Sequence, residues 1–200
     1  MIHCQLSEIF ARRRSIYALG ALSEADTQNV CKLAEQCLKN CPSAFNSQSG
    51  RLLILLRDHH QKLWQLTEQA LLPLTPPEKL AAMQERNRAF AAATGTVLFF
   101  EDQNTVTELQ RQYPLYRDSF PIWSMQSAGM LQYMIWLALA NKNIGASLQH
   151  YNPLIDADVQ KNWQIPAEWK LLAQMPFGRI EAPAGDKSFA PIKSRLKIFD

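Results

Sequence analysis

The sequence lacks any apolar run long enough to span a bilayer, and its first residues lack the basic, apolar and small-residue pattern of a signal peptide. We therefore expect no membrane partner and a cytoplasmic location. Net charge is also small, with a formal value of +3 at pH 7, and the excess lies in short clusters such as Arg12 to Arg14. Such local clusters favour capture of a small anion over binding of nucleic acid.

Cysteine is scarce, and its spacing excludes the common zinc sites. No CxxC pair occurs, and His59 and His60 have no cysteine or acidic partners at metal-ligand spacing, so we predict no metal site. The thiols are expected to be structural and at least partly buried. All four lie in the first quarter of the chain: Cys4, Cys31, Cys37 and Cys41.

The length and apolar content indicate one ordinary domain. The chain has 200 residues, of which 47% are apolar, which is enough to fill a core. We find no internal repeat, low-complexity tract or linker that divides it. The prediction is therefore a single domain over residues 1–200.

The clearest predicted helix begins at Ser23, which can cap it, with Asp26 three residues later. From Val30 to Cys41, apolar residues and cysteines recur at steps of three and four, which indicates an amphipathic helix with its cysteines toward the core. Pro42 should end the helix, because proline supplies no backbone donor.

Apolar runs and breakers indicate the other elements. Residues 52–56 fit a strand buried on both faces, and 96–100 are rich in β-branched and aromatic residues. The segment 124–140 is apolar nearly all round, as in a helix buried in a core or a subunit interface. Further helices are predicted over 58–72 and about 78–93, and further strands over 169–176 and 195–199.

Two polar segments carry candidate chemistry. Arg13, Arg14 and Ser15 combine guanidinium groups with a hydroxyl next to a helix, which suits a phosphate, although such clusters are commonly only solvated surface. The loop from Pro42 to Ser49 is rich in small polar side chains, and by itself it is equally consistent with a simple turn.

These segments occur in the order and spacing of a known family. Arg13-Arg14-Ser15, then Pro42, Ser43, Asn46 and Gln48 as a Pro-Ser-x-x-Asn-x-Gln loop, then Lys193-Ser194-Arg195, resemble the nitroreductase family of FMN enzymes over essentially the whole chain. The likeness is greatest to the short branch of fatty-acid-repression-mutant and copper-induced nitroreductases. Four strings carry that likeness: His60-x-Lys62-Leu63-Trp64, Leu98-Phe99-Phe100-Glu101-Asp102, Leu148-Gln149-His150-Tyr151-Asn152-Pro153 and Ala173-Gln174-Met175-Pro176-Phe177-Gly178.

The resemblance implies an α+β fold with a central, mainly antiparallel sheet flanked by helices. It also implies an intertwined homodimer, with two FMN sites in grooves between the subunits. The flavin carries the chemistry, so no side chain is expected to act as a catalytic acid or base.

The resemblance also assigns residues to the FMN. It implies that Arg13, Arg14, Ser15, Lys193 and Arg195 bind the phosphate, and that Ser43, Asn46 and Gln48 lie along the ring or ribityl chain. Leu148, Gln149 and His150 would line the other face of the ring, where Gly145 would let backbone approach closely. A structural role for His150 is an equal alternative. These cofactor residues belong to the first helix, the loop after the second, and two late segments.

The pyrimidine edge of the flavin is a point of departure from the family. Tyr17 stands where many relatives have a basic residue, and the Gln-Pro-Trp that often ends the loop is here Gln48-Ser49-Gly50. Lys62 is our candidate for that edge, since a cation stabilises negative charge on the reduced ring. The alternative is a lysine on a solvated helix face.

The substrate pocket is predicted at the head of the apolar helix. Trp123, Ser124 and Ser127 would form its roof across the dimer. The alternative is a purely structural role, in which Trp123 packs as an anchor of the subunit interface. The expected activity is reduction of a nitroaromatic or quinone by NADH or NADPH in alternating half-reactions. No Gly-rich dinucleotide fingerprint selects between the two donors.

Two other readings of the sequence remain open at this point. One is a flavin-binding regulatory protein of stress or lipid responses whose reductase activity is incidental. The other is a helical interaction module without any cofactor.

Overall fold

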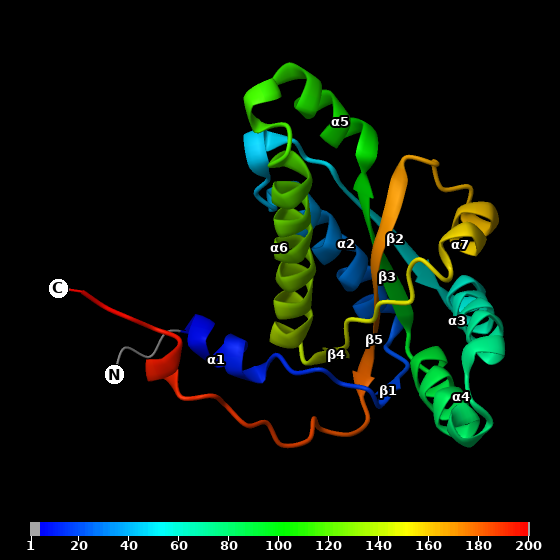
Figure 1. The fold of residues 1–200 in the computed structure, drawn as a ribbon. Coiled ribbons are helices and arrows are strands. Elements are labelled where there is room, and N and C mark those ends of the chain that lie inside the picture. Colours follow the sequence, from blue (N-terminus) through cyan, green and yellow to red (C-terminus); the bar gives the residue numbers. More distant parts are fainter. Residues whose placement is uncertain (1–4, 200) are drawn as a thin grey trace.

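The computed structural model describes residues 5–199 and is built around an antiparallel sheet in the order β1-β5-β3-β2, with β4 also paired to β5 (Figure 1). The strands are β1 Leu19–Gly20, β2 Gly50–Leu56, β3 Gly95–Asp102, β4 Ile144–Ala146 and β5 Trp169–Ile180. The α-helices are α1 Gln5–Arg12, α2 Glu24–Asn40, α3 Arg57–Leu71, α4 Pro77–Ala91, α5 Gln103–Gln112, α6 Phe120–Asn141 and α7 Asp156–Trp163. Short 3-10 turns are η1 Ala44–Asn46, η2 Leu72–Leu74, η3 Pro114–Tyr116 and η4 Ile192–Ser194. The predicted α+β architecture is confirmed.

Helices cover both faces of the sheet, and side-chain alternation along β3 explains why. Val97 and Phe99 pack in the cluster formed with α2 and α6, whereas Leu98 and Phe100 pack in a second cluster with Leu63 of α3. Successive side chains of a strand point to opposite faces, so a continuous apolar run serves two layers. Figure 1 shows α2 and α6 on one side of the sheet and α3 and α7 on the other.

The strand β2 differs from its prediction. It forms, but in this chain only Leu55 is buried among residues 50–56, and the others are half-buried. The physical reason is its place at the edge of the sheet, where β3 is its one neighbour. Burial on both faces was therefore a wrong expectation for the single chain.

The predicted strand over 195–199 is also wrong. After η4 the chain continues as an extended tail, which leads away from α1 in Figure 1. Strands need a hydrogen-bonded neighbour, and within residues 5–199 the tail has none. Its large apolar side chains are consequently exposed: Leu196, Ile198 and Phe199.

The helix α2 forms as predicted. The Ser23 hydroxyl caps it by accepting a hydrogen bond from the backbone N–H of Asp26 at 3.1 Å. Cys37 is buried in the core, while Cys31 and Cys41 are half-buried, and burial raises the pKa of all three thiols. A raised pKa keeps the unreactive thiol form, which fits structural cysteines. Cys4 lies outside the described residues.

Two helices of the structure were not predicted, α5 and α7, and α1 was expected only as a helix beside Arg13–Ser15, without bounds. The clearest signal missed is Asp102, which caps α5 by accepting from the backbone N–H groups of Asn104 at 3.0 Å and Thr105 at 3.3 Å. The apolar helix α6 begins four residues earlier than predicted, at Phe120. Among residues 5–199, no helix has both the length and the apolar character of a membrane span.

Candidate functional site

A hollow of about 480 Å³ lies beside the segment predicted to bind phosphate. Arg13, Arg14 and Ser15 line one side, and the segment 182–187 that follows β5 lines the other. The Arg14 guanidinium donates a hydrogen bond from Nη2 to the carbonyl of Gly185 at 2.5 Å. Guanidinium groups and a hydroxyl at one concave place suit a phosphate dianion, which accepts several charge-assisted hydrogen bonds. We call this the phosphate hollow.

The backbone of this segment is fixed from two sides. Ser15 pairs with Ala146 of β4, and the N–H of Ile16 donates to the Ala146 carbonyl at 3.0 Å. The Arg13 guanidinium carbon lies 4.3 Å from the centre of the Trp136 ring in α6. This cation–π contact and the backbone pairing hold the segment in place before any ligand binds.

Lys193 and Arg195 do not reach the phosphate hollow within the chain. Both are exposed, at and just after η4, and the hollow is lined by Lys187 instead. Their predicted contact with the phosphate stays a prediction. Lys187 was not singled out from the sequence, because nothing local distinguishes it from other surface lysines.

The loop Ser43–Ser49 has an unusual backbone. Phe45, Asn46 and Gln48 have positive φ angles of 55°, 52° and 48°. Non-glycine residues in this region each carry a cost of about 1 kcal/mol or more, and such strain concentrates at functional sites. The Ser43 hydroxyl accepts a hydrogen bond from the backbone N–H of Gln48 at 2.9 Å, which closes the loop on itself. The structure therefore holds Ser43, Asn46 and Gln48 in one turn.

Aromatic side chains hold this loop against the head of α6. The ring of Phe45 lies 4.8 Å from Tyr113, 5.3 Å from Phe120 and 6.2 Å from Trp123, measured between centroids. The Phe45 and Trp123 planes are nearly parallel, at 17°. Trp123, predicted for the pocket roof, is thus tied to the loop of its own chain.

The predicted pocket serines follow Trp123 in α6, Ser124 directly and Ser127 about one turn later. The hydroxyl of Ser124 donates to the carbonyl of Pro121 at 3.1 Å, and that of Ser127 donates to the carbonyl of Trp123 at 3.0 Å. Both side chains are buried against their own helix. Ser127 also lines the hollow described next, so its oxygen remains close to a cavity.

A second hollow, of about 360 Å³, opens between α2, the Ser43–Ser49 loop and α6. Ser43, Gln48 and Ser127 meet here, so three residues predicted for cofactor or substrate share one cavity. Glu101, at the end of β3, lines it as well and is only 1% exposed. Burial raises the pKa of Glu101, although the nearby hydroxyls of Ser49 and Ser124 and the charge of Arg51 act in the opposite direction. We call this the acid hollow.

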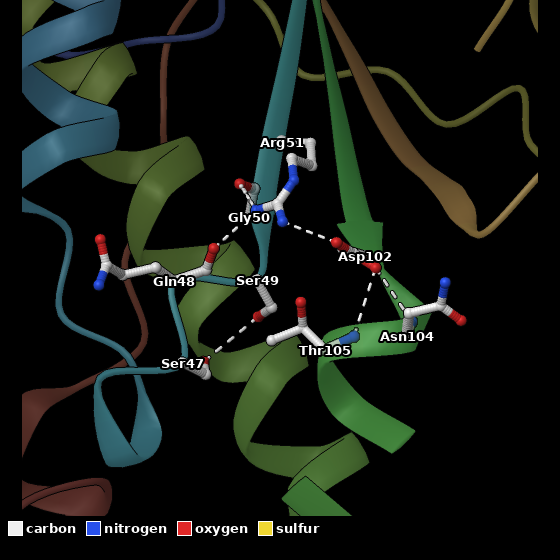
Figure 2. Close-up of polar contacts among 8 residues, drawn as sticks. All are labelled: Ser47, Gln48, Ser49, Gly50, Arg51, Asp102, Asn104 and Thr105. Atoms are coloured by element: carbon white, nitrogen blue, oxygen red, sulfur yellow. Dashed lines mark hydrogen bonds and ion pairs between the residues drawn. The ribbon is translucent and has the colours of Figure 1, made fainter. Parts of the chain in front are cut away.

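Arg51 connects the loop to the end of β3 (Figure 2). Its Nη1 donates to the carbonyls of Gln48 at 2.6 Å and Gly50 at 3.0 Å, and its Nη2 lies 2.6 Å from Asp102 Oδ2. Asp102 Oδ1 in turn caps α5. One arginine therefore joins the loop, two strands and a helix, which sequence reasoning missed because the partners are far apart in the chain.

Tyr17 and Lys62 do not lie together. Tyr17 lines a shallow hollow of about 300 Å³ whose cation is Arg86 of α4, not Lys62. Lys62 projects from an exposed position of α3 and lines none of the hollows described for residues 5–199. Its role at the pyrimidine edge of the flavin stays a prediction, and Arg86 is a second candidate for that role.

The segment after β4 is held against β5. The N–H of Gln149 donates to the carbonyl of Gln174 at 2.7 Å, and the N–H of Tyr151 donates to the Gln174 side chain at 2.8 Å. Alternation along an extended chain directs the N–H of Leu148 to the opposite side. Leu148 and Gln149 are half-buried and His150 is exposed.

Gly145 is tightly packed within the chain, and its predicted closeness to the flavin stays a prediction. A Cβ at this position would lie 2.8 Å from Leu19, 3.0 Å from Ile16 and 3.0 Å from Ile180. Packing within the chain therefore already explains the glycine, with no need for a flavin close by. The family resemblance had suggested backbone approach to the ring instead.

Hydrogen bonds within the chain occupy both ring nitrogens of His60 in α3. Buried His60 contacts Thr96 Oγ1 through Nδ1 at 2.9 Å and the Ala91 carbonyl through Nε2 at 3.2 Å, and Trp64 Nε1 donates to the same Thr96 oxygen at 3.1 Å. This arrangement suits a neutral ring protonated on Nε2. Among the described residues, no three His, Cys, Asp or Glu side chains form a group able to hold a metal ion.

The two predicted halves of the FMN site lie apart in one chain. Arg13 contacts Trp136 of α6, whereas the loop contacts Trp123, thirteen residues earlier in the same helix. At about 1.5 Å per residue, these points are separated by roughly 20 Å along the helix. The chain therefore presents the phosphate hollow and the Ser43–Ser49 loop as separate surfaces.

Comparison with known proteins shows which family this chain resembles. Residues 10–179 match the Nitroreductase family. The HBN1 protein of Saccharomyces cerevisiae is 34% identical over 193 residues, covering 94% of this chain and 93% of that protein.

Solved structures agree with this match. The nitroreductase CinD of Lactococcus lactis in complex with 4-nitrophenol has a TM-score of 0.87 and 45% identity, covering 98% of this chain and all of that one. A Desulfovibrio desulfuricans protein in complex with FMN has a TM-score of 0.71 over 99% of each chain, and at 18% identity it shows the fold alone. The chain belongs to the nitroreductase family.

Proposed function

We propose that the protein is an FMN-dependent oxidoreductase that uses NADH or NADPH to reduce nitroaromatic compounds or quinones in alternating half-reactions. The observation that carries the proposal is the phosphate hollow, where Arg13, Arg14 and Ser15 offer a cationic, concave site outside the core. Bound FMN supplies the two-electron chemistry, and the protein supplies binding, orientation and electrostatics.

A homodimer is part of the proposal. The phosphate hollow and the Ser43–Ser49 loop lie about 20 Å apart along α6, so a second copy would be needed to bring one to the other. Apolar side chains left in water by one chain give this second copy a surface. They lie on α6 and the tail: Ile122, Met125, Met130, Tyr133, Leu196, Ile198 and Phe199.

In this dimer, each segment of the cofactor site would have a distinct task. Arg13 and Ser15 would hold the phosphate, and Lys193 and Arg195 would reach it from the extended tail. Charge-assisted hydrogen bonds of this kind are among the stronger polar contacts in proteins. The strained loop would present Ser43 and Asn46, with Gln48, to the ring or ribityl chain.

Two contacts would tune the ring. The N–H of Leu148, directed away from β5, would donate to the edge of the ring, beside Gln149 and His150. A cation at the pyrimidine edge would stabilise negative charge on the reduced ring, and Lys62 and Arg86 are the candidates. Arg86 has the support of sharing a hollow with Tyr17.

The acceptor class is supported by a relative. The structure of CinD, which is 44–45% identical to this chain, has been solved in complex with chloramphenicol and with 4-nitrophenol. Trp123, Ser124 and Ser127 would border the corresponding pocket. Quinones are included because they accept the same two electrons, and the nicotinamide would bind over the flavin, since the sequence has no separate dinucleotide fingerprint.

An absorbance spectrum tests the proposal. Purified protein should show flavin bands that bleach on anaerobic addition of NADH or NADPH and return with a nitroaromatic or a quinone. Absence of flavin even after reconstitution with excess FMN would reject the cofactor. Bleaching followed by reoxidation no faster with acceptor than in air would instead favour a flavin-binding regulatory protein.

A further inference from the structure

Aromatic rings join the Ser43–Ser49 loop to the turn between α5 and α6. Phe45 belongs to the loop, and the four rings around it all belong to residues 113–123, which we call the aromatic corner. Figure 1 shows the loop beside the head of α6, against which η1 packs. Between centroids, the Phe45 ring lies 4.8 Å from Tyr113, 5.9 Å from Tyr116, 5.3 Å from Phe120 and 6.2 Å from Trp123.

Phe45 has a backbone conformation that a bulky residue rarely adopts. Its φ of 55° and ψ of 25° lie in the left-handed region, where a side chain crowds the backbone. The side chain is 51% exposed, so burial in a core does not account for this conformation. Tilted, edge-to-face and stacked contacts with four rings stabilise it instead. The aromatic corner therefore favours the left-handed form of the loop.

The aromatic corner has no polar tie to the loop. Its hydrogen bonds are local: the N–H of Tyr116 donates to the carbonyl of Tyr113 at 3.0 Å, and the N–H of Ser119 donates to the carbonyl of Tyr116 at 2.9 Å. The side chain of Gln110 donates to the carbonyl of Arg117 at 2.9 Å. Within residues 5–199, the hydrogen bonds of the corner stay inside α5, η3 and α6. The ring contacts of Phe45 therefore transmit the geometry of the loop to the corner.

Phe45 has two backbone conformations available. A right-handed φ would relieve its strain, but it would also redirect the Cβ and turn the ring out of the corner. The neighbouring Asn46 has a positive φ as well, so the two residues hold the left-handed turn together. A ligand that contacts this turn favours the conformation in which the ring lies in the corner.

We propose that Phe45 is a positioning residue that couples FMN binding at the loop to the placement of the aromatic corner. The inference rests on the proposed function, in which Ser43 and Asn46 contact the flavin and Trp123 borders the acceptor pocket. FMN fixes the left-handed loop, and the Phe45 ring then fixes Trp123, so the acceptor pocket is completed only when flavin is present. Coupling between two sites is reciprocal, so the corner in turn raises the affinity for FMN.

A double-mutant cycle tests this reciprocity. The full chain is titrated with FMN, and flavin fluorescence reports binding. Phe45→Gly removes the ring and still suits a left-handed φ, whereas Tyr113→Ala removes the nearest ring of the corner. Each should raise the Kd for FMN about tenfold, and the double variant should bind no more weakly than Phe45→Gly alone.

Two matched variants serve as controls. Phe45→Tyr keeps the ring and should restore the wild-type Kd. Leu115→Ala shortens a side chain of the corner that is 86% exposed and has no ring to contact Phe45, so it should leave the Kd unchanged. Tyr113 is 40% exposed, so Tyr113→Ala keeps the test available even if Phe45→Gly does not fold.

Hydrogen exchange separates coupling from a merely structural role. Saturating FMN should slow amide exchange in residues 113–123 about tenfold in wild type and Phe45→Tyr, and less than about twofold in Phe45→Gly. If Phe45 only stabilised the corner, its loss would speed exchange equally with and without FMN, and the tenfold ratio would remain.

Three results would overturn the inference: multiplying effects of the two substitutions on the Kd, an unchanged Kd in Tyr113→Ala, or FMN-dependent slowing that persists in Phe45→Gly. The last would mean that the flavin or the partner subunit shields the corner directly. Wild-type protein that binds no FMN would overturn the proposed function and this inference together. Normal reduction and reoxidation of the flavin with uncoupled variants would overturn the inference alone.

Discussion

The guanidinium of Arg51 lies 2.6 Å from the carboxylate of Asp102, across the start of β2 and the end of β3 (Figure 2). The same guanidinium holds the carbonyls of Gln48 and Gly50, and the same carboxylate caps α5. The pair is partly buried, with side chains 29% and 13% exposed, so solvent weakens it less than a surface pair. It fixes the exit of the strained loop that carries Ser43 and Asn46.

Removing this contact should loosen the loop. Arg51→Met should lower the free energy of unfolding by about 1–2 kcal/mol, because it removes charge-assisted hydrogen bonds and leaves Asp102 unpaired. FMN affinity should fall about tenfold by fluorescence titration, since the loop loses its fixed geometry. Arg57→Met is the control, because its pair with Glu24 is exposed and should be dispensable. Equal effects of both variants would contradict a specific role for Arg51.

If the phosphate hollow binds the FMN phosphate, a substitution there should weaken FMN binding but not riboflavin binding. Arg13→Ala should weaken FMN binding about 10- to 100-fold and leave riboflavin, which has no phosphate, nearly unaffected. Arg12→Ala is a matched control, because this neighbouring arginine is exposed and does not line the hollow. A similar loss for FMN and riboflavin would show that Arg13 acts through folding, for example through its contact with Trp136.

Buried His60 predicts a dependence of stability on acid. Burial lowers the pKa of His60 from 6.5 to about 4, so the unfolded chain takes up a proton at a higher pH than the folded chain. The neutral ring therefore contributes fully to the free energy of unfolding above pH 6.5. This contribution, about 3 kcal/mol in total, is lost as the pH falls toward 4.

The variant His60→Gln isolates this contribution in urea unfolding curves between pH 4 and 7. Its deficit in unfolding free energy relative to wild type should shrink as the pH falls. Comparing the two proteins matters because the raised pKa values of Glu101 and Asp156 act in the opposite sense on acidification. A deficit that stays constant over this range would disprove the prediction.

A pair of glycine substitutions tests how closely β1 packs against β5. In Gly178→Ala the new Cβ would meet the Gly20 carbonyl oxygen, where β5 pairs with β1. Backbone has to move, so we expect a loss of about 2–4 kcal/mol in thermal or urea unfolding. Gly129→Ala meets nothing within 4 Å in α6 and should be neutral or stabilising by up to about 1 kcal/mol. Similar stabilities for the two variants would contradict the packing described.

Local chemistry was the part of this fold that could be predicted well. The cap at Ser23 and the three- and four-residue spacing placed α2, because helices are set by neighbours within a few residues. The apolar run of β3 was found for the same reason. The start of α6 was misplaced by four residues, because Pro121 in its first turn, a position that favours proline, was not used as a signal.

Errors occurred where an element depends on distant partners. The segment 52–56 has the composition of a central strand, but its position at the sheet edge leaves it half-buried. The segment 195–199 has a strand-like composition and no strand within the described chain to pair with. Composition cannot supply a neighbour, and hydrogen-bonded neighbours decide both burial and strand formation.

By itself, the sequence determined the main helices and strands and the order of motifs that carries the family resemblance, because these depend on spacing along the chain. Tertiary structure alone decided which side chains meet. It brought Arg51 to Asp102 and enclosed Glu101 beside Ser43 and Ser127. It also kept the phosphate hollow away from the loop. Such contacts arise from sheet register and helix packing, which join residues that are remote in sequence.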